Sequence, residues 1–90
     1  MNVSLALIIW EGREMAERPL DVIHRSLDKD VLVILKKGFE FRGRLIGYDI
    51  HLNVVLADAQ LIEGGEVTKK YGKIVIRGDN VLAISPVETE

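Results

Sequence analysis

The sequence predicts a mainly β domain in which one N-terminal helix precedes a strongly bent, five-stranded antiparallel small barrel. Three observations support this fold class. One segment has helical spacing, five apolar segments with strand character follow it, and Gly43 and Gly47 interrupt the longest of these. Glycines inside a strand suit the sharp bends that wrap a small sheet around its core. A sandwich would need more strands than this chain of 90 residues supplies.

The expected helix covers residues 19–27, where Leu20, Ile23 and Leu27 recur at positions i, i+3 and i+7. Pro19 suits the first turn, because the first N–H groups of a helix have no partner inside it. The spacing therefore predicts one short amphipathic helix.

Two strands and a tight turn are expected next. Residues 31–35 form a continuous apolar run, which is typical of a strand covered on both faces. Lys36, Lys37 and Gly38 then mark the turn. In the second strand, apolar or small residues alternate with charged residues with a period of two. One face holds Phe39, Phe41, Gly43 and Leu45, and the other holds Glu40, Arg42 and Arg44.

The third strand is expected over residues 53–62. Its alternation places a set of apolar side chains on one face, namely Val55, Ala57, Ala59 and Leu61. Gly64 and Gly65 mark the turn that follows.

The last two strands are expected at residues 73–77 and 81–85, joined through residues 78–80, and Pro86 should end the ordered part. Both are apolar and carry neither a proline nor an inward charge in mid-strand. Such edges aggregate unless another strand pairs with them. Head-to-tail pairing that closes on itself gives a ring, so we expect a homo-oligomer.

Composition limits the possible classes of protein. The chain has no cysteine, so disulfides and thiolate metal sites are excluded. Hydrophobic residues make up 48% of the chain, but no run reaches the roughly 18 apolar residues of a membrane span. We expect a cytoplasmic protein that is not attached to a membrane.

The net charge is −2, but the basic residues are clustered. Two segments hold them: Lys36, Lys37, Arg42 and Arg44 in the first, and Lys69, Lys70, Lys73 and Arg77 in the second. A phosphate responds to charge within about 10 Å, so a local basic site can exist on a slightly acidic chain. Taken alone, exposed lysines are better explained as ordinary solvated surface.

The chain divides into three parts. Residues 1–14 differ from the rest, and we expect them to be a non-core N-terminal extension upstream of a natural start at Met15. An extra strand or a sticky arm is the alternative for this segment. Residues 15–87 form the domain, and residues 88–90 form an acidic tail.

Two loops supply the side chains of a nucleobase pocket. The first carries His51 and Asn53, and the second carries Arg77 and Asp79 at the same spacing. Imidazole rings and guanidinium planes stack on base faces, while a carboxamide offers a donor and an acceptor to a pyrimidine edge. The set favours RNA as the ligand. Alone, His51 would be an incidental loop histidine, and Arg77 with Asp79 a weak surface ion pair.

Residues 19–85, about three quarters of the chain, resemble an archaeal Sm-like (Lsm) protein. The first family motif is found at residues 39–56, with its glycine, aspartate and asparagine present, and the second at residues 74–81. Together and in this order the motifs are specific. The resemblance implies the Sm fold, an SH3-like barrel with a helix on five bent strands.

The resemblance also implies a function. Proteins of this family form rings, typically heptameric, that bind uridine-rich single-stranded RNA around the pore as scaffolds or chaperones in RNA processing and turnover. Arg77-Gly78 is similar to the archaeal and eukaryotic form of the second motif, which favours a heptamer. RNA-processing or decay proteins are implied as further partners.

Carried over by position, His51 and Arg77 would stack on the two faces of a uracil. Asn53 would recognise the base edge, and Asp79 would complete the pocket. Selectivity for uracil requires that neighbours hold the Asn53 amide in one orientation, because a freely turning amide satisfies cytosine as well.

Two groups are candidates for holding Asn53, namely Asp49 and a backbone group of the turn at Gly78. For Asp49, a role as a carboxylate that braces the loop is equally plausible. Arg18, His24 and Tyr48 are candidates for a secondary RNA contact outside the pore, although Tyr48 also suits a packing role at a strand end.

No serine or cysteine nucleophile and no metal-binding spacing accompanies the carboxylates of the chain. We therefore expect no enzymatic activity, no metal and no cofactor. The alternative function is a protein-interaction scaffold ring with incidental RNA binding, because small barrels of this shape host many functions.

Overall fold

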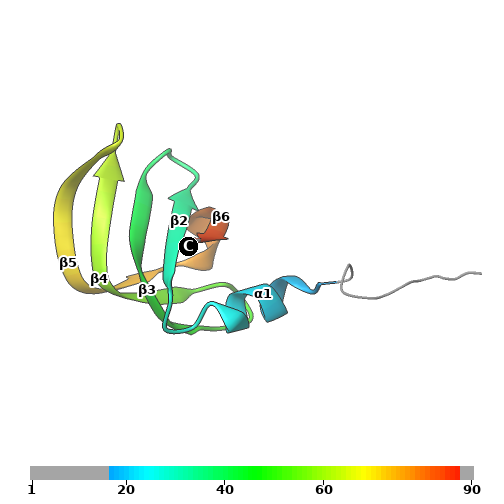
Figure 1. Cartoon of the computed structure of the whole chain (residues 1–90). Coiled ribbons are helices and arrows are strands. Elements are labelled where there is room, and N and C mark those ends of the chain that lie inside the picture. The colour runs from blue at the N-terminus through cyan, green and yellow to red at the C-terminus, as the bar shows by residue number, and fades with distance from the viewer. Residues whose placement is uncertain (1–16, 88–90) are drawn as a thin grey trace, which may run out of the picture.

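The computed structural model describes residues 17–87 (Figure 1). The predictions for the N-terminal extension, residues 1–14, and for the tail, residues 88–90, therefore concern residues outside this range. Across the described range, no helix is long and apolar enough to cross a membrane.

The helix α1 spans Pro19–Arg25 and begins where the sequence predicted, but it ends two residues earlier. At its end, the Ser26 hydroxyl donates a hydrogen bond to the carbonyl oxygen of Val22 (3.0 Å). Ile23 is buried in the core and Leu27 packs against it, whereas Leu20 remains 38% exposed. The helix thus contributes only part of its apolar face.

Five antiparallel strands form one sheet in the order β5-β4-β3-β2-β6, which confirms the predicted fold class. In Figure 1 the sheet curves strongly, with α1 at one end and the β2–β3 and β4–β5 turns at the other. The strands are β2 Asp30–Leu35, β3 Glu40–Tyr48, β4 Val54–Glu63, β5 Glu66–Ile76 and β6 Val81–Pro86.

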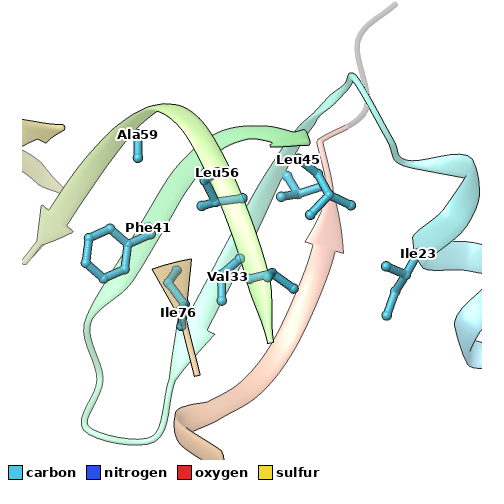
Figure 2. Close-up of a cluster of buried hydrophobic side chains, with 9 residues drawn as sticks. Ile23, Val33, Phe41, Leu45, Leu56, Ala59 and Ile76 are labelled. Atoms are coloured by element: carbon cyan, nitrogen blue, oxygen red, sulfur yellow. The ribbon is translucent and has the colours of Figure 1, made fainter. Parts of the chain in front are cut away.

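The core lies inside the curve of the sheet (Figure 2). Its fully buried members come from three neighbouring strands and are Val31, Val33, Leu45, Val54 and Leu56. The alternation predicted for β3 is confirmed from Phe41 to Leu45, since Phe41, Gly43 and Leu45 are buried while Arg42 and Arg44 are exposed. It is wrong for Phe39, which precedes β3 and remains exposed. Burial of these apolar surfaces is the main force that stabilises so small a sheet.

The face predicted for the first half of β4 was wrong. Val54 and Leu56 are fully buried in the core and Val55 is not, and Ala57, although buried, pairs with the exposed Arg44 and is not part of the core cluster. Ala59 is in the core, as predicted. A bulge causes this switch. Between the pairs Arg42↔Gln60 and Arg44↔Ala57 of the β3–β4 ladder, β4 holds one residue more than β3.

The bulge contains Asp58, whose φ is 52°. Opposite it, Gly43 lets the strands approach closely, because a Cβ atom there would lie 3.0 Å from the carbonyl oxygen of Ala57. The predicted bending role of Gly43 thus has a specific physical cause. A second irregularity in the β3–β4 ladder lies between Leu45 and Gly47.

Strand β5 begins at Glu66, seven residues earlier than predicted. Gly64 (φ 59°) and Gly65 (φ 84°) form a two-residue turn between the paired residues Glu63 and Glu66. Residues 66–72 are mostly polar and mostly exposed, with Val67 and Tyr71 as the exceptions, so no apolar alternation revealed the strand. Their pairing with β4 makes them part of the sheet.

The two edges of the sheet are β5 and β6, as predicted. Each is paired on one side only within residues 17–87. Both edges also carry an exposed apolar side chain, Val75 on β5 (65% exposed) and Leu82 on β6 (67% exposed). These open edges are suited to pairing with strands from other molecules.

Candidate nucleic-acid interface

The two polar loops predicted from sequence lie side by side. The pairing of Val54 with Ile76 joins the start of β4 to the end of β5, which brings residues 49–53 next to the 3₁₀ turn η2, Gly78–Asn80. The backbone N–H of Gly78 donates a short hydrogen bond to Oδ1 of Asn53 (2.7 Å). This bond connects the two halves of the candidate site directly.

Asp49 organises the first loop. Its Oδ1 accepts hydrogen bonds from the backbone N–H groups of His51 (2.9 Å) and Asn53 (3.1 Å). Its Oδ2 accepts a hydrogen bond from Nδ2 of Asn53 (3.0 Å). One carboxylate thus fixes both the backbone of the loop and the amide of its key side chain.

The Asn53 carboxamide is held at both ends. Its oxygen faces the N–H of Gly78, and its nitrogen faces the carboxylate of Asp49. Rotating the amide by half a turn would place a donor against the N–H of Gly78 and an acceptor against the carboxylate, so only one orientation satisfies both neighbours. One amide N–H and one oxygen lone pair remain free for a ligand.

Position 78 must be glycine for this contact to form. A Cβ atom at Gly78 would overlap the backbone carbonyl oxygen of His51. The turn and the loop therefore approach through bare backbone. Any larger residue would push η2 away from Asn53.

Leu52 sets the directions of its neighbours. It adopts a left-handed φ of 62°, and its side chain packs against the core. His51 beside it is exposed, and Asn53 is half-buried. The loop is thus anchored by an apolar residue between its two polar ones.

An open hollow of about 510 Å³ lies at this site, lined by Tyr48, Asp49, Asn53, Val55, Val75 and Arg77. Of the predicted residues, it brings together Asn53, Arg77 and Asp49, and also Tyr48, which was predicted for a contact outside the pore. His51 and Asp79 do not line it. The valines were not predicted, although the register pair Val55↔Val75 forms an apolar wall beside the polar groups.

The charged groups at the rim are exposed. Arg77 forms an ion pair with Asp79 (3.3 Å), and their side chains are 76% and 63% exposed. Such a pair contributes at most about 1 kcal/mol to stability.

His24 and Tyr48 also meet. Nδ1 of His24 lies 2.9 Å from the Tyr48 hydroxyl, and the rings are in an edge arrangement 6.0 Å apart. They line a second, shallow hollow together with Ile46 and Ile50. Arg18 does not line this hollow, and it pairs with Asp21 instead (2.9 Å). Tyr48 packs against the core as well, as its alternative role predicted.

No group of three or more His, Cys, Asp or Glu residues within residues 17–87 is placed to hold a metal ion. The polar side chains that line the hollow include the carboxylate of Asp49, the amide of Asn53 and the guanidinium of Arg77. Amide and guanidinium groups are suited to hydrogen bonding and stacking with a ligand.

The bent five-stranded sheet, the helix at one end of it and the two polar loops together are typical of one class of protein, the Sm-like proteins. The family model of the LSM domain matches residues 21–86, and the chain belongs to that family. The resemblance seen in the sequence is thereby confirmed.

Individual relatives are very similar. The Sm protein of Pyrococcus abyssi, solved in complex with a uridine heptamer, is 90% identical with a TM-score of 0.78, over 79% of this chain and 100% of that one. The SmAP1 heptamer of P. aerophilum is 44% identical with a TM-score of 0.75, over 79% of this chain and 95% of that one. An snRNP Sm-like protein of Pyrococcus horikoshii is 90% identical over 82% of this chain and 99% of its own length.

The hydrogen bonds of Asp49 predict a dependence of stability on pH. The hydrogen bond from the Asn53 amide, followed by those from the backbone N–H groups of Asn53 and His51, lowers the pKa of Asp49 below its ordinary value of 3.8. A lowered folded pKa means that the stabilisation is complete above the unfolded pKa and is lost as the pH falls through the folded one.

We therefore expect Asp49→Asn to be less stable than the wild type near neutral pH, and the difference to shrink as the pH falls from about 5 to about 2. Denaturant unfolding followed by circular dichroism measures both proteins across this range. Glu66→Gln controls for the loss of one negative charge, because Glu66 is exposed and forms no ion pair within residues 17–87. A difference between wild type and Asp49→Asn that is independent of pH would contradict this assignment.

Proposed function

We propose that this protein assembles into a closed ring, heptameric as in SmAP1 of P. aerophilum, and binds uridine-rich single-stranded RNA around its pore. The uridine heptamer bound by the P. abyssi relative supports the ligand. The ring acts in the cytoplasm as a scaffold or chaperone for RNA processing and turnover, performs no catalysis itself and recruits processing or decay proteins. The observation that carries the proposal is the fixed carboxamide of Asn53 beside Arg77 in one hollow.

Asn53 selects the base. Uracil presents the N3–H donor next to a carbonyl acceptor, which matches the free oxygen lone pair and the free N–H of the held amide. Cytosine in the same position presents an acceptor at N3 and a donor at its exocyclic amine. Asp49 and Gly78 prevent the amide from turning. In cytosine, N3 would therefore face the amide oxygen, acceptor against acceptor, and the exocyclic amine would face the amide N–H, donor against donor.

His51 and Arg77 hold the faces of the base. The guanidinium lines the hollow that Asn53 occupies, and the exposed imidazole of His51 lies on the same loop as Asn53. Asp79 orients the guanidinium through their ion pair. His24 and Tyr48, with Arg18 on the preceding segment, form the secondary contact outside the pore.

Ring closure makes weak pockets useful. Stacking contributes roughly 1–3 kcal/mol per base, which is too little for one pocket to hold RNA tightly. Identical pockets around a ring raise the effective concentration of each successive nucleotide, so their contributions multiply. Assembly is therefore part of the binding mechanism.

We expect His51→Ala and Arg77→Ala each to weaken oligo-U binding about tenfold or more, because each removes a stacking surface. Fluorescence anisotropy with a labelled uridine heptamer measures the affinity. Lys70→Ala, an exposed cation on β5 outside the site, is the matched control for Arg77→Ala. Light scattering verifies that each variant keeps its assembly, and unchanged affinity in an intact ring would reject the assignment.

We expect Val75→Lys and Leu82→Lys to break the assembly, because each places a charge at an exposed apolar position on an edge strand. Light scattering should give seven times the mass of one chain for the wild type and smaller species for these variants. Ile50→Lys changes an equally exposed apolar residue in a loop and should leave the mass unchanged. A wild-type protein that stays a single chain at micromolar concentration would refute the ring.

A further inference from the structure

A separate hollow of about 300 Å³ lies where the β2–β3 turn meets η2. Its lining is Leu35, Lys36, Lys37, Phe39 and Asn80. None of these residues lines the hollow that contains Asn53. The second hollow thus uses a different set of side chains, drawn from the first basic cluster of the sequence.

The walls of this hollow are fixed by backbone hydrogen bonds. The N–H of Lys36 donates to the carbonyl oxygen of Asn80 (3.0 Å), which joins the turn to η2. Within the turn, the N–H of Gly38 donates to the oxygen of Leu35 (2.9 Å), and the N–H of Leu35 donates to the oxygen of Phe39 (2.8 Å). The residues that line the hollow are therefore carried by a well-braced turn.

Phe39 is placed to meet a ligand. It precedes β3 and remains 41% exposed, although a large aromatic side chain usually gains by burial. Its exposed surface borders the hollow beside two lysines. An aromatic ring next to cations is the combination that holds single-stranded nucleic acid, since bases stack on the ring and phosphates meet the cations.

The charge around this hollow is positive. Lys36 and Lys37 are exposed, and neither forms an ion pair with an acid in residues 17–87. No acidic residue lines the hollow. The acid on η2, Asp79, is already paired with Arg77.

We propose that this hollow is a second nucleotide subsite for the same RNA strand, in which a base stacks on Phe39 and its phosphate contacts Lys36 and Lys37. The inference rests on RNA binding at the Asn53 site. The two sites are continuous, because η2 bonds to both: Gly78 to Asn53 at one end, and Asn80 to Lys36 at the other.

The second subsite does not select a base. Phenylalanine has no polar edge, and the Asn80 side chain forms no hydrogen bond within residues 17–87 that would fix its amide. A free amide turns to suit any base. This contrasts with Asn53, which is held at both ends. The subsite therefore extends the contact to nucleotides next to a uridine run, whatever their sequence.

The test compares a uridine heptamer with the same heptamer extended by four adenylates at its 5′ or 3′ end. At least one extension should strengthen binding to the wild type about tenfold. Phe39→Leu and the double variant Lys36→Gln, Lys37→Gln should remove this gain and leave the affinity for the plain heptamer unchanged. Phe39→Trp should keep the gain, because it retains a stacking surface.

The controls separate this inference from the proposed function. Asn53→Ala should weaken the plain heptamer, whereas the Phe39 variants should not. The lysine variant should also reduce the salt dependence of binding for the extended oligonucleotide only. If neither extension strengthens binding, or if the gain survives Phe39→Leu and the lysine variant, the second subsite is refuted. If the wild type does not bind the plain heptamer, the proposed function itself fails.

Discussion

The hold on the Asn53 carboxamide is the interaction on which the site depends. Two neighbours from distant parts of the chain, the Asp49 carboxylate and the Gly78 N–H, fix the nitrogen and the oxygen of one amide. Neither neighbour alone would suffice, because an amide held at one end can still turn or shift. The long pairing of β4 with β5 is what brings Gly78 to this position.

The bends in the strands position the two loops of the site. The bulge at Asp58 and the close approach at Gly43 curve β3 and β4 around the core. The loop between β3 and β4 contacts η2, which directly follows β5. The same curvature leaves β5 and β6 as open edges. A single subunit therefore offers weak pockets together with the edges through which copies would join, and in the proposed ring these two properties combine into one RNA clamp.

Much of the fold could be predicted from local pattern. The start of the helix, the alternation in β3 and the two edge strands follow from spacing and composition. Which residues at the start of β4 face the core could not be predicted, because this depends on a bulge, and the bulge depends on how β3 and β4 pair. Residues 66–72 of β5 carry no apolar alternation and become a strand only by pairing with β4. In the site, the sequence offered Asp49 and the backbone at Gly78 as alternative groups that could hold the Asn53 amide. In the structure both form a hydrogen bond with this amide, and Asp49 also braces the backbone of the loop.

The position of His51 marks the limit of sequence reasoning about the site. It is exposed and lies outside the hollow lined by Asn53 and Arg77, because Leu52 turns inward between His51 and Asn53. Side-chain directions in such a loop depend on its backbone angles, which spacing alone does not supply. The valine wall of the hollow was missed for a related reason, since it arises from a cross-strand register between Val55 and Val75.

The most direct test of the central claim is the ratio of the dissociation constants for oligo-C and oligo-U, measured in the wild type and in Asp49→Asn. Asparagine at position 49 can still accept the backbone N–H groups of the loop, but it no longer fixes the Asn53 amide through a carboxylate. The account predicts a large ratio for the wild type and a ratio close to one for an intact ring of the variant. A variant that prefers uridine as strongly as the wild type would contradict it.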